Sequence, residues 1–274
     1  MGVKSRAVPN PLLLAAILGL VEGITEFLPV SSTGHLYLVG HWLGLEGEQE
    51  RAFEIFIQLG AVLAIAWDFR GPLLTTARRA WREEPARRLL AGVLVAFFPA
   101  AVAGLAFHGL IEKYLFFKGP IALALIVGGL LILLVESLHL RPRTEELESV
   151  TWGQALAVGC AQVAALFPGF SRSAATILGG LVVGMSRPVA TEFSFYLAIP
   201  TIAAASIYSL IEELPRLAGS DTPFFAIGLT ASFLSAALVV RVFLAFVRRS
   251  TFRPFAWYRI AFGVVLFLLP GEGR

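Results

Sequence analysis

A helix interrupted by proline near the start of the chain constrains the fold more than any other stretch. Residues 19–36 read G-L-V-E-G-I-T-E-F-L-P-V-S-S-T-G-H-L. Glu22 and Glu26 are four residues apart, so a helix places both carboxylates on one face. Pro29 breaks that helix, because proline lacks the N–H donor and clashes with the preceding turn. Polar groups at a break inside an apolar run are costly to bury, so they indicate a functional site.

A second helix is expected directly after the break. Three hydroxyl residues provide N-cap candidates there: Ser31, Ser32 and Thr33. His35 follows on the first turn, three residues after Ser32, a spacing at which helical side chains meet. Imidazole can take a proton from a hydroxyl group or attack phosphorus itself. The stretch therefore predicts a hairpin of two helices whose tip carries two acids and a candidate nucleophile.

Composition favours an all-α polytopic membrane protein. Of the 274 residues, 57% are hydrophobic and 15% are charged, whereas about a quarter of a soluble domain is charged. The apolar runs are continuous rather than alternating, which favours helices over a transmembrane barrel. The net charge is only +3, and the arginines gather between apolar runs, which indicates membrane topology rather than nucleic-acid binding. Cys160 is the single cysteine, which excludes an intrachain disulfide.

The chain repeats itself with an offset of about 139 residues. G-x-x-E at 19–22, followed by P and S-S-T, returns as G-x-x-Q at 159–162, followed by P and S-R-S. Each half reads as a re-entrant hairpin plus three spans, and because three is odd the second half lies inverted. We predict a single membrane domain with inverted repeats at 1–138 and 151–274. The expected spans are 53–69, 89–110, 119–138, 189–211, 223–247 and 255–270, and the hairpin segments are 11–28, 31–45, 151–167 and a last one starting at 171.

Arginines between the spans set the expected orientation. Segments 70–88, 139–150 and 248–253 hold eleven basic residues, and such loops favour the cytoplasmic side. The loop expected at 46–51 is acidic and is placed outside. The first hairpin then opens to the outside, and both termini lie there.

The second tip predicts an anion site. It reads P-G-F-S-R-S-A-A-T from 168 to 176. Ser171 can cap the following helix, whose free N–H groups and positive dipole end attract anions. Arg172 adds a planar fork of donors that fits phosphate. Two further hydroxyl donors follow at Ser173 and Thr176.

The first tip predicts a cation site. Two buried carboxylates on one face repel each other, and a divalent cation or the arginine would let Glu22 and Glu26 both stay ionised. Mg²⁺ or Ca²⁺ suits carboxylate oxygens combined with substrate phosphates. The alternative is that one or both glutamates are neutral and hydrogen-bonded.

Both motifs resemble those of a known family. E-G-I-T-E-F-L-P-V-S-S-T-G-H-L and P-G-F-S-R-S-A-A-T are similar to the two signature motifs of the undecaprenyl-pyrophosphate phosphatase (UppP/BacA) family, and the resemblance covers essentially the whole chain. It implies an enzyme of the bacterial plasma (inner) membrane that hydrolyses undecaprenyl diphosphate to the monophosphate. That reaction recycles the carrier lipid for peptidoglycan synthesis and is associated with bacitracin resistance. The implied fold is an inverted repeat with two re-entrant helix pairs.

The resemblance also implies roles for individual residues. Glu22 and Glu26 match the family's paired glutamates, which serve as its metal ligands. Ser32 and His35 match its essential serine and histidine. Arg172 matches its phosphate-binding arginine. Substrate-binding positions in the same motifs are held by Ser31, Thr33, Ser171, Ser173 and Thr176.

Two questions stay open at this point. Either Ser32 attacks phosphorus with His35 as its acid/base partner, or His35 is the nucleophile. The alternative function is a polyprenyl-phosphate flippase or secondary transporter, because paired broken helices in an inverted repeat are a transporter architecture. The expected partners are the polyprenyl diphosphate lipid and the bilayer, with no nucleic acid, and a homodimer is a candidate assembly. The site is expected to open to the periplasmic or extracellular side.

Overall fold

The computed structural model describes residues 10–43, 48–213 and 222–269. Within these ranges the chain is helical, and a parallel bridge between Thr144 and Met185 is the one piece of β structure. The elements are α1 Pro11–Thr25, α2 Ser32–Leu43, α3 Glu48–Asp68, α4 Arg70–Arg79, α5 Glu84–Leu115, α6 Lys118–Ser137, η1 Leu147–Ser149, α7 Trp152–Gln162, η2 Val163–Leu166, α8 Arg172–Val182, α9 Arg187–Glu213, α10 Thr222–Val247 and α11 Arg253–Leu268.

The helices confirm an all-α membrane protein. Among the described residues, four stretches are long and apolar enough to cross a bilayer: Glu84–Leu115, Lys118–Ser137, Arg187–Ser209 and Thr222–Val247. Two apolar helices are shorter, Pro11–Thr25 and Trp152–Leu166. They are the first arms of the two predicted hairpins. Crossing the hydrocarbon core takes about 20 residues, so each of these helices is too short to cross it alone.

Two predicted loops are partly helical. The segment 70–88 contains α4, and α5 begins as early as Glu84. The acidic segment 46–51 was predicted as a loop, but α3 begins at Glu48, and residues 46 and 47 lie outside the described residues. Both differences have the same cause, because Arg, Leu, Ala, Glu and Gln are strong helix formers even where they are too polar to span a membrane.

Each hairpin packs against a long helix from the other half of the chain. α1 runs along α10, and α7 runs along α5. A Cβ on Gly19 would lie 2.2 Å from the Gly228 carbonyl oxygen, and one on Gly159 would lie 2.4 Å from the Ala96 carbonyl oxygen. Only glycine therefore allows these two helix pairs to approach so closely.

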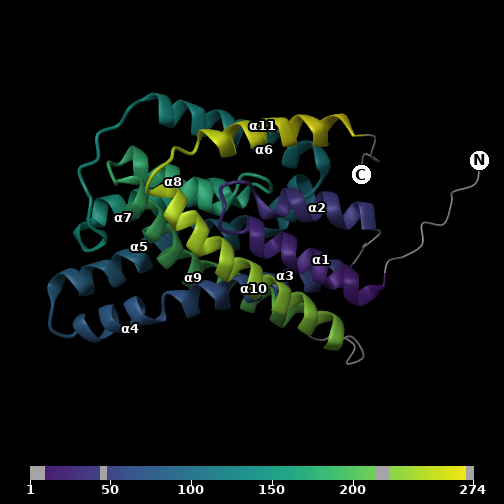
Figure 1. Ribbon diagram of the computed structural model, residues 1–274, viewed down its shortest axis with the longest axis horizontal. Coiled ribbons are helices and arrows are strands. Elements are labelled where there is room, and N and C mark those ends of the chain that lie inside the picture. Colours follow the sequence, from purple (N-terminus) through teal and green to yellow (C-terminus); the bar gives the residue numbers. More distant parts are fainter. Residues whose placement is uncertain (1–9, 44–47, 214–221, 270–274) are drawn as a thin grey trace, which may run out of the picture.

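The centre of the molecule is apolar and lies around α9. Phe193, Phe195 and Leu197 are completely buried there, and α9 contacts α3, α5 and α8. α6 and α11 form a separate pair that packs beside the hairpin tips (Figure 1). This arrangement holds both tips inside the protein rather than against lipid.

The arginine-rich segments gather at one end of the molecule. In Figure 1 the turn between α4 and α5 and the linker between α6 and α7 lie at the left, whereas α1 begins and α11 ends at the right. Arg79 at the end of α4 donates to Glu148 of the linker at 2.7 Å. It also donates to Glu83 at 2.8 Å, and this hydrogen bond lowers the pKa of the Glu83 carboxyl. At the opposite end, Lys118 donates to the Leu269 carbonyl oxygen at 2.6 Å.

Candidate active site

Both hairpin tips turn through a serine in the left-handed backbone region. Residues 26–31 join α1 to α2, and residues 167–171 lead into α8. Ser31 has φ of +73° and Ser171 has φ of +75°, a region that few residues other than glycine adopt. The Ser171 Oγ accepts a hydrogen bond from the Ala174 N–H at 3.2 Å, which confirms the predicted N-cap. Such backbone strain is typical of functional sites.

The Glu26 carboxylate joins the two tips. Its Oε2 accepts a hydrogen bond from the Ser32 hydroxyl at 2.7 Å, and its Oε1 accepts one from the Arg172 guanidinium at 3.2 Å. The side chains of Glu26 and Arg172 are only 6% and 11% exposed, so water screens their attraction weakly. A hydroxyl that donates to a buried carboxylate is placed to lose its proton to it.

Arg172 is held from two further directions and keeps one donor open. Its Nη1 donates to the backbone oxygen and to the hydroxyl of Ser194 on α9, each at 3.2 Å. Its guanidinium lies 5.7 Å from the centre of the Phe27 ring. The buried Nε has no hydrogen-bond partner within the described part of the chain. A buried cationic donor without an acceptor is suited to an anionic ligand.

Glu22 lies one turn before Glu26 and is 2% exposed. Its Oε1 is buried and has no hydrogen-bond partner among the described residues. The charges of Glu26, Glu54 and Arg172 all act on this carboxylate. Because an unsatisfied buried carboxylate is strongly unfavourable, a proton, a water molecule or a cation is required beside it.

These residues fit a divalent cation that arrives with phosphate. Within the ranges described above, no group of three or more His, Cys, Asp or Glu side chains is placed to hold a metal ion. Glu26 already bonds Ser32 and Arg172, whereas Glu22 has an open oxygen. Mg²⁺ commonly binds one or two carboxylates and completes its shell with water and substrate phosphates, whereas Ca²⁺ takes about six to eight oxygens. The donor set therefore suits Mg²⁺ better than Ca²⁺.

Ser173 and Thr176 are completely buried behind the second tip. The Ser173 hydroxyl donates to the Leu28 carbonyl oxygen of the first tip at 2.8 Å. The Thr176 hydroxyl donates to the Arg172 carbonyl oxygen at 2.9 Å and lies 2.7 Å from the Ser194 hydroxyl. These hydroxyls connect the tips to each other and to α9, so in this structure they shape the site from behind.

The His35 ring is fixed by α2 and α11. Its Nδ1 lies 2.7 Å from the Ser31 carbonyl oxygen, and its Nε2 lies 2.6 Å from the Tyr258 hydroxyl. The ring stacks on Phe262 with centroids 4.5 Å apart. Because Nδ1 faces a carbonyl oxygen it carries the proton, which leaves Nε2 to accept from Tyr258.

The predicted contact between Ser32 and His35 is replaced by others. The Ser32 hydroxyl donates to Glu26, and the His35 nitrogens contact Ser31 and Tyr258. Helical spacing brings residues three apart near each other, but it cannot anticipate an acceptor across the turn. Of the other two hydroxyl residues in this tip, Ser31 is buried and Thr33 is half-buried.

Arg259 is a site residue that sequence reasoning missed. This completely buried side chain donates to the Pro29 carbonyl oxygen at 3.2 Å and to those of Gly169 and Phe170 at 3.2 and 2.7 Å. It also donates to two carbonyl oxygens of α6. One guanidinium thus binds the backbone of both tips. The signal was present, because an arginine inside the predicted span 255–270 requires an internal partner.

Comparison with known proteins identifies the relatives of this chain. Residues 15–265 match the model of the family described as bacitracin resistance protein BacA. An undecaprenyl-diphosphatase of Ectopseudomonas mendocina is 52% identical over 252 residues, which cover 92% of this chain and 91% of that protein. Another, from Nitrosospira multiformis, is 49% identical over 262 residues, 96% of both chains. A third, the undecaprenyl-diphosphatase 1 of Chromobacterium violaceum, is 51% identical over 251 residues, 91% of this chain and 93% of the relative.

Proposed function

This chain belongs to the BacA family of bacitracin resistance proteins, and from that membership we propose how its two tips carry out the reaction of an undecaprenyl-diphosphatase. The protein hydrolyses undecaprenyl diphosphate to undecaprenyl phosphate and inorganic phosphate in the membrane. The product is the carrier lipid that cell-wall synthesis uses again. The observation that carries the proposed mechanism is the Glu26 carboxylate, which bonds Ser32 on one oxygen and Arg172 on the other.

Arg172 binds the diphosphate in this proposal. Its open Nε and the free N–H groups at the start of α8 supply donors to the phosphate oxygens. They also stabilise the charge that develops as the P–O bond breaks. Ser171 holds the start of α8 in place, Ser173 holds the second tip against Leu28 of the first, and Thr176 supports Arg172 from behind. Ser31 and Thr33 flank Ser32, and the Ser31 hydroxyl supports the start of α2 by accepting a hydrogen bond from the Gly34 N–H.

Ser32 is the proposed nucleophile. Its oxygen attacks the terminal phosphorus while its proton moves to Glu26, and Glu26 passes that proton to the departing undecaprenyl phosphate, which leaves Glu26 ionised again. Water then attacks the phosphoserine and gives a proton to Glu26, which transfers it to the serine oxygen as the bond from phosphorus to that oxygen breaks and inorganic phosphate leaves. A divalent cation held by Glu22 together with the phosphates would neutralise charge on the diphosphate. Hydrolysis is balanced by these two steps, with one water consumed.

His35 holds α2 in register with α11 in this mechanism. The alternative makes His35 the nucleophile, since its Nε2 would be released if the Tyr258 hydroxyl moved away. Quenching the enzyme during turnover and mapping the phosphoryl group decides between them. Phosphate on Ser32 supports the proposal, phosphate on His35 supports the alternative, and no phosphoenzyme would point to direct attack by water.

The inverted repeat belongs to the same proposal. It is supported by the crosswise packing of α1 on α10 and of α7 on α5, and by the matching backbone angles of Ser31 and Ser171. We place the arginine-rich end in the cytoplasm. The first hairpin then opens to the periplasmic or extracellular side, and the substrate headgroup reaches the tips from there.

Phosphate release from undecaprenyl diphosphate by purified protein in detergent tests the function. We expect release with Mg²⁺, loss of release with EDTA, and recovery when Mg²⁺ is restored. Release that is unaffected by EDTA would contradict the cation at Glu22. Absence of release at every metal concentration would favour the flippase or transporter, which the comparisons do not favour. A homodimer stays part of the proposal, and the mass of the detergent-solubilised protein tests it.

A further inference from the structure

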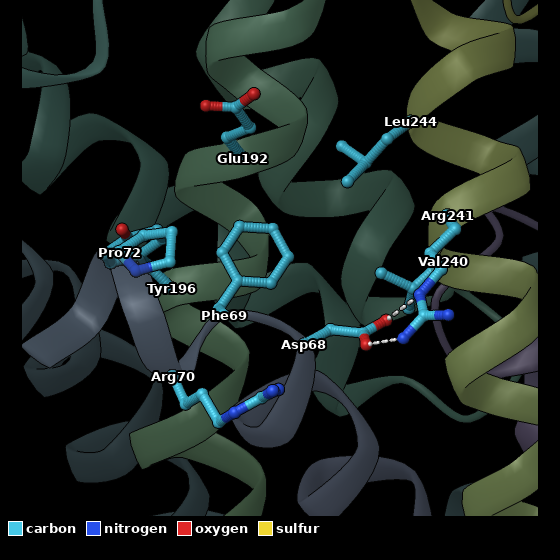
Figure 2. A pocket seen from close by; sticks show the side chains of 9 residues that line it. All are labelled: Asp68, Phe69, Arg70, Pro72, Glu192, Tyr196, Val240, Arg241 and Leu244. Carbon is cyan, nitrogen blue, oxygen red and sulfur yellow. Dashed lines mark hydrogen bonds and ion pairs between the residues drawn. The ribbon is translucent and has the colours of Figure 1, made fainter.

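A hollow of about 380 Å³ lies away from the two tips. It is bounded by the bend where α3 meets α4, by α9 and by α10 (Figure 2). Its apolar surface comes from Phe69, Val240 and Leu244. Such a mixture of apolar floor and polar walls is the usual form of a small-molecule site.

The polar groups of the hollow are divided by sign. Figure 2 shows the Glu192 carboxylate on one side of the Phe69 ring and the Arg70 and Arg241 guanidinium groups on the other. Arg241 is paired with Asp68, with its Nε 3.1 Å from Oδ2, yet its side chain remains 67% exposed. The hollow therefore offers an acceptor at one end and cationic donors at the other.

Glu192 has room for a further donor. The nearest cation in the described residues is Arg248, whose Nη2 lies 3.9 Å from Oε1, beyond hydrogen-bonding distance. The Glu192 side chain is 29% exposed. A primary ammonium group could therefore bind it directly, as a charge-assisted hydrogen bond.

We propose that this hollow binds the headgroup of a bilayer phospholipid that carries a primary amine. The ammonium donates to Glu192, and the phosphate accepts from Arg70 and Arg241. Two apolar side chains that line the hollow, Pro72 and Leu244, provide surface for the start of the acyl chains. A zwitterionic headgroup fits both ends of the hollow, whereas an anionic headgroup meets Glu192 with the wrong sign.

This site would act on the catalytic tips through α9. Glu192 faces the hollow, and Ser194, two residues later, bonds Arg172 on another side of the same helix. A lipid bound between α3, α9 and α10 would fix the position of α9. Binding should therefore stabilise the protein as well as retain the lipid.

Native mass spectrometry of the full-length protein in detergent tests the proposal. Three lipids serve as probes. Phosphatidylethanolamine carries the primary amine, phosphatidylcholine keeps the charges but has no N–H donors, and phosphatidylglycerol lacks the amine. We expect phosphatidylethanolamine to bind most tightly of the three and to raise the melting temperature. Glu192→Gln should weaken its binding about tenfold, as loss of one charged hydrogen bond would, and should strengthen phosphatidylglycerol binding, because the repulsion between Glu192 and the anionic headgroup is removed.

Glu84→Gln is the matched control, because Glu84 is an exposed acid at the same end of the molecule, beside Arg88. It should leave lipid preference unchanged. Arg70→Gln should weaken the binding of all three lipids. If Glu192→Gln fails to fold, the Arg70 variant decides whether the hollow is the binding site. Equal binding of the three lipids by the unmodified protein, or equal losses in the Glu192 and Glu84 variants, would overturn the proposal.

Discussion

At the scale of single residues, the Glu26 carboxylate is the group that contacts both the candidate nucleophile and the phosphate-binding arginine. Its Oε2 accepts a hydrogen bond from the Ser32 hydroxyl, and its Oε1 accepts one from the Arg172 guanidinium. Phosphate can bind the open Nε of Arg172, which is a different nitrogen from the one that contacts Glu26. Glu26 therefore keeps both contacts and stays beside the Ser32 hydroxyl while substrate is bound.

Glu26→Gln keeps the size of this side chain but removes its charge. We expect kcat to fall by about 10²–10⁴, the usual contribution of a general base, and the melting temperature to fall as well, because the buried Arg172 loses its counter-charge. The measurement is phosphate release alongside thermal unfolding. Glu145→Gln, at an exposed acid in the linker, should keep full activity. A Glu26→Gln enzyme that retains more than a tenth of the activity would contradict the assigned role.

Arg259 acts on backbone atoms rather than on substrate. Arg259→Lys keeps the charge but concentrates the donors on one nitrogen, which cannot reach both tips and α6 together. Each buried carbonyl left without its donor costs about 1–3 kcal/mol. We expect a large fall in melting temperature together with loss of phosphate release. Arg253→Lys, at an exposed position on the same helix, serves as control, and equal melting temperatures for the two variants would contradict the role of Arg259.

At the scale of elements, the hairpins depend on two close helix crossings. Gly19→Ala would drive a methyl group to 2.2 Å from a carbonyl oxygen of α10, and Gly159→Ala would do the same on α5 at 2.4 Å. Overpacking of this kind costs about 1–3 kcal/mol. Both variants should unfold at lower temperature than the unmodified protein.

Gly153→Ala is the control for these variants, because a Cβ at Gly153 in α7 meets nothing within 4 Å. Alanine has the higher helix propensity by up to about 1 kcal/mol, so this change should be neutral or stabilising. If Gly19→Ala and Gly153→Ala had the same effect, the close crossing of α1 and α10 would be wrong.

The sequence predicted the elements better than their contacts. Among the described residues, hydrophobic runs located four helices that are long and apolar enough to cross a bilayer, whereas the predicted spans 53–69 and 255–270 fall on α3 and α11, which are helical but are not among those four. The cap at Ser171 followed from residue type alone. The helix α4 was missed because a polar arginine-rich segment gives no apolar signal, although its propensity is high. The bonds from Ser32 to Glu26 and from Tyr258 to His35 could not be predicted, because they depend on how a turn folds and on a helix more than 200 residues away.

At the scale of the whole molecule, charge distinguishes its two ends. The arginine-rich segments lie together (Figure 1), and Arg79 ties one of them to the linker between the halves. The proposed orientation puts that end in the cytoplasm. The exposed positions Arg82 and Glu145 lie there, whereas Lys113 lies near the other end of α5.

Cysteine labelling in intact cells tests this orientation, in a Cys160→Ser background because Cys160 is exposed. A membrane-impermeant maleimide should label Lys113→Cys. It should reach Arg82→Cys and Glu145→Cys only after the membrane is permeabilised. Labelling of Arg82→Cys and Glu145→Cys from opposite sides would contradict the fold, and a complete reversal of the pattern would contradict the orientation alone.

The way Arg259 binds the tips has a consequence for redesign. Its acceptors there are backbone oxygens of Pro29, Gly169 and Phe170, and every amino acid supplies a backbone oxygen. These hydrogen bonds therefore do not depend on side-chain identity at a position such as Phe170, where the side chain adds only a ring 5.9 Å from the Arg259 guanidinium. Libraries that vary this residue could seek altered lipid preference while the scaffold beneath it stays in place.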